Sequence, residues 1–246
     1  AHFVDGRELH FTRVLATVEG AVVRGAGDGE EVARDEGPWA VNLAKPGPLD
    51  ARSGDGRSWG LTSLSLPPGT YLLSAPLAPA AEYFANVNLS DDDLTAYVAM
   101  HDDGHTVRFD GEARWLGGDC RVTDGAFDFA SLPQVVTFSF GFALPGDCEV
   151  TRALTPGADA VAELEVRPGA LFSDGAALRF DLLAALGRTH LTERELADAG
   201  LAAPVPWRTC GPVSPDEPQT GTVHYDGGVV TGLRDFMARD LLRCPR

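Results

Sequence analysis

Over its first two thirds, the chain alternates between apolar and polar positions in many short runs. Successive side chains of a strand point to opposite faces of a sheet, so this period of two predicts half-buried strands. Turn-forming residues separate the runs, as at Pro67-Pro68-Gly69. Strands are expected over residues 8–24, 39–43, 59–66, 70–77, 82–89, 94–100, 105–115, 121–129, 134–143 and 160–167. The same period relates five phenylalanines and predicts a buried sheet face made of Phe127, Phe129, Phe138, Phe140 and Phe142.

After about residue 168 the apolar spacing changes to that of helices. Leucines of the run 176–186 fall on one helical face. Thr192 and Glu195 have the spacing of a capping box, which predicts a helix from Thr192 to about Gly200. A last helix is expected over 229–243.

Many short strands with few helices between them favour a mainly β fold. We expect an antiparallel β-sandwich of Greek-key type over residues 1–167. A small helical or irregular C-terminal part, residues 168–246, is expected to pack on this sandwich.

One segment, LTSLSLPPGTYLLSAPL at residues 61–77, resembles a known structural element. It is similar to the strand–LPPGTY–strand element of prealbumin-like and B-type repeat modules of bacterial surface proteins. The resemblance implies a prealbumin-like β-sandwich that serves as a stalk or adhesin scaffold. Some of these modules are locked by a Lys–Asn isopeptide bond. Because Lys45, the only lysine, lies in a Lys-Pro-Gly-Pro loop rather than in an apolar strand, we do not expect that crosslink here.

Composition and charge narrow the class of protein. The chain has 246 residues, of which 44% are hydrophobic, so it has enough apolar material for a core. Its 36 acidic and 20 basic residues give a net charge of -16, which argues against nucleic acid as a partner. No apolar run approaches the roughly 18 residues of a membrane-spanning helix.

Four cysteines, an even number without any C-x-x-C spacing, suggest disulfides rather than a zinc or thioredoxin-like site. Three connectivities are possible, and we favour Cys120–Cys148 with Cys210–Cys244 because each pair lies within one block of similar composition. Paired cysteines indicate an oxidising compartment.

The start of the chain at Ala1, without methionine or a leader, fits a mature exported product. It also fits a sequence prepared for expression, or a lipoprotein whose anchoring cysteine precedes this sequence. We therefore expect an extracytoplasmic location: the periplasm, the outer-membrane surface or secretion.

Motifs of several enzyme classes are missing from the sequence. There is no G-x-S-x-G nucleophile elbow, no G-x-x-x-x-G-K-[ST] loop and no G-x-G-x-x-G after a strand. We therefore expect a protein that is not an enzyme. A hydrolase acting on glycans stays an alternative, with carboxylates that spacing alone does not identify.

The sequence Met-His-Asp-Asp-Gly-His, which starts at Met100, is the strongest candidate for a metal site. A hairpin turn here would place His101 and His105 opposite each other on two strands, about 5 Å apart. Two imidazoles at that separation bind copper or zinc, with Asp102 or Asp103 as an oxygen ligand and Met100 suited to Cu(I).

Two weaker metal sites are also predicted. Ala1-His2 combines an α-amino group and an imidazole in a chelate attractive to Cu(II). The acidic run Ser90-Asp91-Asp92-Asp93 between two expected strands has the composition of half a calcium site.

These patterns favour a non-enzymatic structural or binding protein of a bacterial cell surface or periplasm. Its expected partners are other surface proteins or further copies of itself. The alternative is a periplasmic copper-binding protein that uses His101 and His105 or the chelate at His2.

Overall fold

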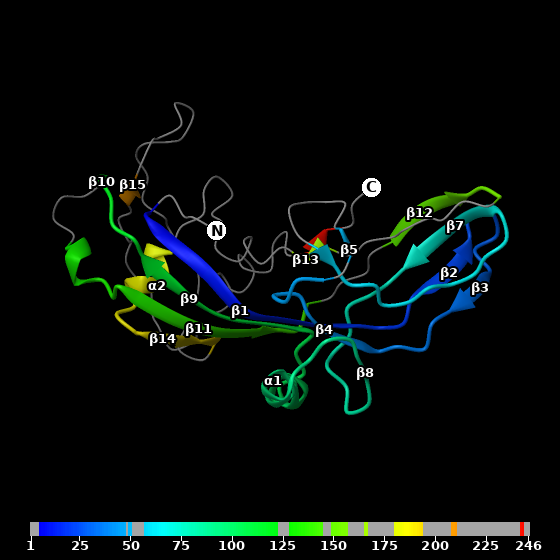
Figure 1. Cartoon of the computed structure of the whole chain (residues 1–246), viewed down its shortest axis with the longest axis horizontal. Helices are drawn as coiled ribbons and strands as arrows, with labels where there is room; N and C mark the ends of the chain where they lie inside the picture. Colours follow the sequence, from blue (N-terminus) through cyan, green and yellow to red (C-terminus); the bar gives the residue numbers. More distant parts are fainter. Residues whose placement is uncertain are drawn as a thin grey trace. The chain divides into compact units, whose positions relative to one another are not determined.

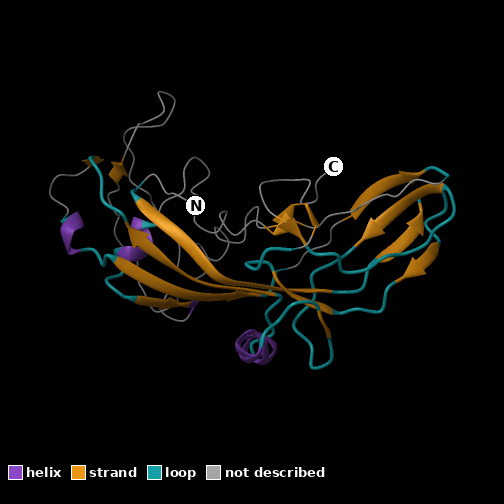
Figure 2. Cartoon of the chain, in the orientation of Figure 1, coloured by secondary structure: helices purple, strands orange, loops and turns teal. Residues whose placement is uncertain are grey.

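A computed structural model describes residues 5–47, 49–50, 57–122, 128–144, 149–156, 165–166, 180–193, 208–210 and 242–243 of the chain. The fold is mainly β and sandwich-like, with one helix of three turns, which confirms the expected fold class (Figure 2).

The largest sheet in the described part has six strands in the order β14-β11-β9-β1-β4-β8 (Figure 1). Two of its pairs, β11 with β14 and β4 with β8, are parallel, so the sheet is mixed rather than purely antiparallel. Its strands are β1 Arg7–Val18, β4 Trp39–Asn42, β8 Ala85–Asn86, β9 Val107–Trp115, β11 Val135–Phe142 and β14 His190–Thr192.

A second, antiparallel sheet has the order β12-β7-β2-β3. It consists of β2 Val22–Gly25, β3 Glu31–Arg34, β7 Gly69–Ser74 and β12 Glu149–Leu154. Three two-stranded ribbons pair β5 Leu49–Asp50 with β6 Arg57–Ser58, β10 Cys120–Val122 with β15 Arg208–Cys210, and β13 Glu165–Val166 with β16 Leu242–Arg243.

The helices whose bounds lie within the described residues are α1 Asp91–Asp102, α2 Asp181–Ala184 and the 3-10 turn Phe129–Ser131. The prediction of a strand at 94–100 is therefore wrong: these residues form most of α1. Apolar residues at 94, 96, 98 and 100 alternate as in a strand, whereas Leu94, Tyr97 and Met100 recur every three residues and share one helical face.

Other predicted elements differ in part. Residues 59–66 are irregular, and 82–89 hold only the two residues of β8. Thr192 ends strand β14, and Glu193 directly after it is helical, as expected for a helix that Thr192 caps; residues 194–200 lie outside the described residues. Residues 176–179 and 229–241 also lie outside them, while residues 181–184 of the expected helix at 176–186 form α2.

The chain divides into two compact units that interleave along the sequence. Unit 1 comprises residues 1–12, 109–140 and 168–241, and unit 2 comprises 13–108, 141–167 and 242–246. The expected boundary at 167/168 is one of the divisions, but residues 1–12 and 109–140 belong with the C-terminal part.

Each unit has its own apolar centre. In unit 1, Phe138 packs against Phe140 with ring centroids 5.3 Å apart and against Phe180 at 6.1 Å. In unit 2, α1 contributes Ala96, Tyr97 and Met100 to a cluster that also contains Leu15 and Ala40. Burying these side chains is the main favourable term for each unit.

Candidate functional site

The predicted copper hairpin does not form, because its first strand is helix α1. His101 lies in the last turn of α1, is 43% exposed, and has Nδ1 3.2 Å from Asp102 Oδ1. Asp102 and Asp103 are exposed at the helix end. His105 follows the turn, where its amide donates to the carbonyl of Met100 at 2.9 Å.

The surroundings of the two histidines explain this correction. Met100 is fully buried in the apolar cluster of unit 2, so its sulfur is not available to an ion beside exposed His101. The His105 ring occupies the space where a side chain at position 141 would lie, since a Cβ built on Gly141 collides with the imidazole. Among the described residues, no group of three or more His, Cys, Asp or Glu side chains is arranged to hold a metal ion. His2 lies outside the described residues.

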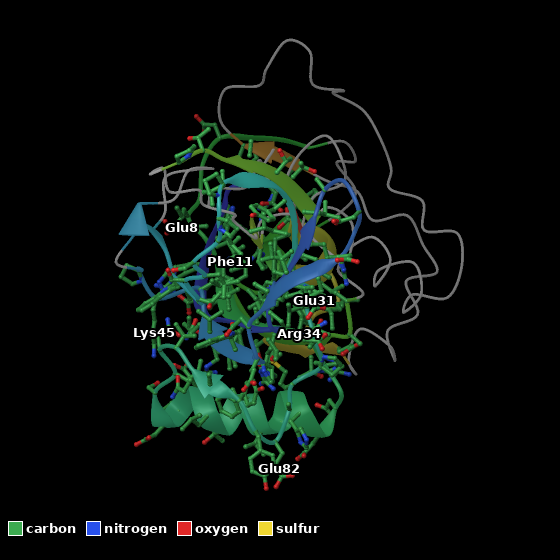
Figure 3. All side chains as sticks on the ribbon, turned by 90° about the vertical axis from the view of Figure 1, so that its right-hand side faces the viewer. Glu8, Phe11, Glu31, Arg34, Lys45 and Glu82 are labelled. Carbon is green, nitrogen blue, oxygen red and sulfur yellow. A yellow bond between two sulfur atoms is a disulfide. The ribbon has the colours of Figure 1, made fainter. Side chains whose placement is uncertain are left out.

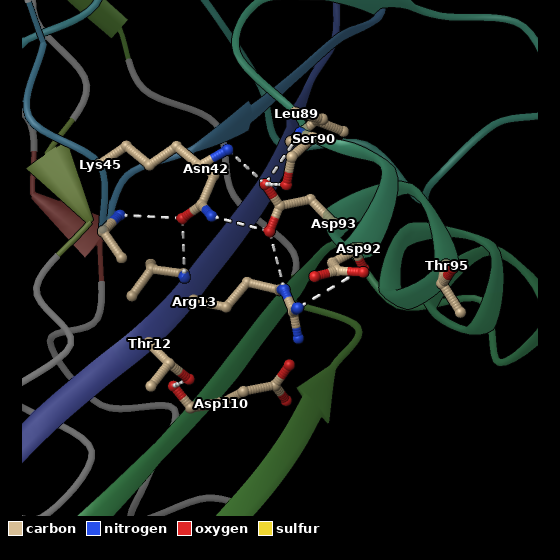
Figure 4. Close-up of polar contacts among 12 residues, drawn as sticks. Thr12, Arg13, Asn42, Lys45, Leu89, Ser90, Asp92, Asp93, Thr95 and Asp110 are labelled. Carbon is tan, nitrogen blue, oxygen red and sulfur yellow. Dashed lines mark hydrogen bonds and ion pairs between the residues drawn. The ribbon is translucent and has the colours of Figure 1, made fainter.

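The best-defined polar site in unit 2 is centred on Asp93, at the start of α1. We call Arg13, Asn42, Lys45, Ser90 and Asp93 the Asp93 cluster (Figure 4). Arg13 Nε donates to Asp93 Oδ1 at 2.9 Å, and Lys45 Nζ donates to Oδ2 at 2.6 Å. Asn42 Nδ2 donates to Oδ1 at 3.1 Å, and the Ser90 amide and hydroxyl donate to Oδ2 at 3.0 and 2.8 Å.

These donors control the ionisation of Asp93. Burial by itself raises the pKa of the carboxyl, but the hydrogen bonds from Lys45, Ser90 and Arg13 outweigh burial and hold the pKa well below its usual range. Asp93 is therefore a permanent anion with both oxygens occupied. It fastens the start of α1 to Arg13 on β1 and to Asn42 on β4.

This arrangement argues against calcium binding by the run 90–93. Calcium requires about six to eight oxygen ligands. Here the only buried carboxylate of the run, Asp93, is neutralised by an arginine and a lysine, while Asp91 and Asp92 are exposed. Two cations beside one carboxylate disfavour a third cation at the same place.

A neighbouring asparagine completes the attachment of this segment. Asn88 Nδ2 donates to the Asn42 carbonyl at 2.8 Å, and the Asn42 amide donates to Asn88 Oδ1 at 2.7 Å. Lys45 Nζ also donates to the Asn88 carbonyl at 2.9 Å. The lysine is therefore held by a carboxylate and a backbone oxygen, rather than facing an asparagine side chain in an apolar strand.

A second charged cluster is buried in unit 1. We call Asp5, Arg7, Asp181 and Arg208 the charged quartet. Arg7 Nε donates to Asp181 Oδ1 at 3.0 Å, while Arg208 Nε and Nη2 donate to Asp181 Oδ2 and Oδ1 at 2.6 and 3.1 Å. All four residues are at most 4% exposed.

Asp5 completes the quartet by binding the start of α2. Its Oδ2 accepts from the amides of Phe180 and Asp181 at 2.5 and 2.7 Å. Burial and the nearby charge of Asp181 raise the pKa of Asp5 to about 6, against the opposing effect of these hydrogen bonds and of Arg7. Asp5 thus titrates near neutral pH.

Aromatic rings surround the two arginines of the quartet. Arg208 Cζ lies 4.7 Å from the ring centre of Trp115 and 5.2 Å from that of Phe129. Arg7 Cζ lies 5.9 Å from the Phe180 ring. These stacking contacts compensate in part for the hydration that the guanidinium groups lose on burial.

Local sequence patterns predict little of either cluster. Asp5 and Asp181 are separated by 176 positions, and Arg13 and Asp93 by 80. Only the Ser90–Asp93 spacing, which matches a helix N-terminus, was a local signal.

The favoured cysteine pairing is wrong, because Cys120 is bonded to Cys210. These two residues are direct partners in the antiparallel register of β10 and β15, which brings them together across 90 positions. Composition along the chain carries no information about such a long-range pairing. Cys148 and Cys244 lie outside the described residues.

Chemically, both clusters neutralise buried carboxylates with arginine or lysine, an arrangement suited to fastening elements together. None of the helices in the described ranges is long and apolar enough to cross a membrane. In comparisons with known proteins, no family model, no curated protein and no solved structure matches this chain.

Proposed function

We propose that this chain is a non-enzymatic structural or binding protein that works outside the cytoplasm, at a bacterial surface or in the periplasm. The observation that carries the proposal is the Cys120–Cys210 disulfide. Disulfides persist in oxidising compartments and are rare in the cytosol.

The position of the disulfide supports a role in holding the fold. It joins β10 to β15, and these two strands have three residues each. Ribbons this short are only marginally stable by themselves. A covalent link restricts the unfolded chain and so stabilises the folded state. For two cysteines 90 positions apart, the loss of loop entropy corresponds to roughly 4–5 kcal/mol.

The charged side chains support the same view. Asp93 and Asp181 each accept from arginine or lysine at both carboxylate oxygens. A carboxylate bound in this way is poorly suited to acid–base chemistry, which requires a proton acceptor within reach of a substrate.

Thiol blocking in intact cells tests the proposal. Cells of the source organism are treated with an alkylating reagent before lysis, and the protein is then digested without reduction. We expect one crosslinked peptide pair containing Cys120 and Cys210, recovered from the extracytoplasmic fraction. Alkylated Cys120 and Cys210 in native protein, or recovery from the cytosol alone, would overturn the proposal.

A further inference from the structure

Two side chains attach strand β15, which has three residues, to other parts of unit 1. Arg208 binds Asp181 of α2 through two nitrogens, and Cys210 is bonded to Cys120. In the described part of the chain, the short ribbon with β10 is the only strand pairing of β15. The position of Arg208 therefore depends on what holds this strand in place.

The disulfide also lies against the residues that flank Asp5. A Cβ built on Gly6 would be 3.1 Å from Cys210 Sγ and 3.2 Å from Trp115 Nε1, so the backbone between Asp5 and Arg7 packs directly on the disulfide. Leu116 donates its amide to the Gly6 carbonyl at 3.0 Å. The disulfide, the Asp5 segment and the charged quartet thus form one contiguous cluster in unit 1.

Charge is balanced in this cluster only while Arg208 is present. With Arg208 in place, Asp5 and Asp181 face Arg7 and Arg208, two anions against two cations. Without Arg208, two buried carboxylates would share Arg7 alone. One of them would then favour the protonated form, because an uncompensated buried charge is costly.

We propose that the Cys120–Cys210 disulfide and Arg208 form a redox-linked latch in unit 1, which makes the attachment of α2 to the Asp5 segment more strongly dependent on pH once the disulfide is reduced. A dithiol reductant supplies the two electrons and two protons, becomes a disulfide itself, and leaves Cys120 and Cys210 as thiols. Strand β15 then separates, and Arg208 leaves Asp181. The latch is regulation beyond the proposed function and does not rest on where in the cell the protein works.

The sign of the pH effect follows from the quartet. The attached state binds a proton at Asp5 more tightly than the detached state, since burial and Asp181 raise the pKa of Asp5 to about 6. Losing Arg208 leaves Arg7 as the single cation of the quartet beside Asp5 and Asp181, so the charge of Asp181 is less compensated and we expect the pKa of Asp5 to rise further. Reduction should therefore loosen α2 most above neutral pH and least in mild acid, where Asp5 carries its proton.

The test uses the Cys120→Ser/Cys210→Ser double variant of the whole chain, which leaves Cys148 and Cys244 in place. Hydrogen exchange is measured at the amides of Phe180 and Asp181, which donate to Asp5. The ratio of exchange rates between variant and parent is compared at about pH 8 and about pH 5, so that the intrinsic pH dependence of exchange cancels.

We expect this ratio to be about tenfold larger at the higher pH for each unit by which the pKa of Asp5 rises. Adding Asp5→Asn should make the exchange-rate ratios at the two pH values equal. The control is Asp119→Asn, which removes an exposed carboxyl beside Cys120 and should leave the difference between the two ratios unchanged. Equal ratios at both pH values, or a difference that survives Asp5→Asn, would overturn the latch.

If the double variant does not fold, Arg208→Gln with the disulfide intact tests the step in which Asp181 loses Arg208. It should show the same excess of exchange at high pH, and parent-like protection at both pH values would overturn the latch. Thiol blocking that finds Cys120 and Cys210 free in cells would refute the proposed location, but it would leave this comparison on oxidised protein valid.

Discussion

At the scale of single residues, Asp5 and Asp93 show how neighbours give two buried carboxyls opposite pKa shifts. Asp93 receives hydrogen bonds from two cationic side chains, which lower its pKa. Asp5 receives backbone amides but lies beside a second carboxylate, Asp181, and its pKa is raised. The stabilisation from Asp93 is therefore present at neutral pH and is lost only in strong acid, whereas that from Asp5 is present in acid and is lost as pH rises.

Asp93→Asn tests the first of these carboxyls. The variant removes the negative charge between Arg13 and Lys45 while keeping the shape of the side chain. We expect the free energy of unfolding, from urea titration, to fall by about 2–3 kcal/mol, the range for a buried, charge-assisted contact.

Glu31→Gln is the matched control for this experiment. Glu31 pairs with Arg34 at 2.7 Å on β3, but both side chains are exposed (Figure 3). Solvent screens such a pair, so no measurable change is expected. An equally small effect of Asp93→Asn would show that the Asp93 cluster does not fasten α1.

Asp5 gives a prediction of pH dependence. Its pKa rises from 3.8 to about 6 on folding, so its contribution is fully present below about pH 4 and is lost as pH rises through about 6. The stability of the parent relative to Asp5→Asn should fall over this window by up to about 3 kcal/mol. Urea titrations of both proteins at several pH values measure this difference, and a difference that rises with pH would contradict the assignment.

At the scale of elements, close backbone approaches decide where side chains are tolerated. Gly20 and Gly37 lie against each other in the segments after β1 and before β4. A Cβ on Gly20 would collide with the carbonyl oxygen of Asp35 and approach the amide nitrogen of Gly37 to 2.9 Å. Backbone atoms cannot rotate away as side chains do, so this position requires glycine.

Gly20→Ala should therefore destabilise the protein by about 1–3 kcal/mol, the usual cost of overpacking. Gly27→Ala is the control, because a Cβ there meets nothing within 4 Å. It should leave stability unchanged or raise it slightly by restricting the unfolded chain. Thermal unfolding of the two variants compares them, and similar midpoints would refute the close approach.

At the scale of the whole molecule, the net charge of -16 acts on every part of the chain. Like charges repel one another in the compact state and favour expansion. The described ion pairs offset this repulsion only locally, because each joins a few groups.

Salt should therefore stabilise the protein. Raising sodium chloride from about 10 mM to about 150 mM shortens the screening length to about 8 Å and should increase the midpoint of thermal unfolding at neutral pH. Near pH 4.6, the isoelectric point, the net charge vanishes and the same addition should have little effect. A midpoint that falls with salt at neutral pH would mean that attractive pairs outweigh the net repulsion.

The sequence by itself determined those elements that a local alternation of apolar and polar residues predicts. The expected strands at 105–115 and 134–143 contain β9 and β11, and the expected strand at 8–24 corresponds to two strands, β1 and β2. Phe138, Phe140 and Phe142 are buried as their period of two predicted. Alternation suffices there because each strand has a hydrogen-bonding neighbour on either side and one apolar face to bury.

Where two local patterns compete, tertiary contacts decided the outcome. Residues 94–100 fit a strand or a helix, and α1 forms with Asp93 held by Arg13 and Lys45 while Tyr97 and Met100 fill the core of unit 2. Residues 59–66 alternate well, yet they are irregular, since they pair with no strand of the described part.

Only the tertiary structure could reveal the pairing of Cys120 with Cys210 and the charged quartet. The disulfide spans 90 positions, and the contacts of Asp181 with Arg208 and Asp5 span 27 and 176 positions. No periodicity in a sequence encodes which distant residues meet. Local patterns report which face of an element is buried. The partners across that buried face are chosen by the packing of the whole chain, which is why the strands were predictable and the clusters were not.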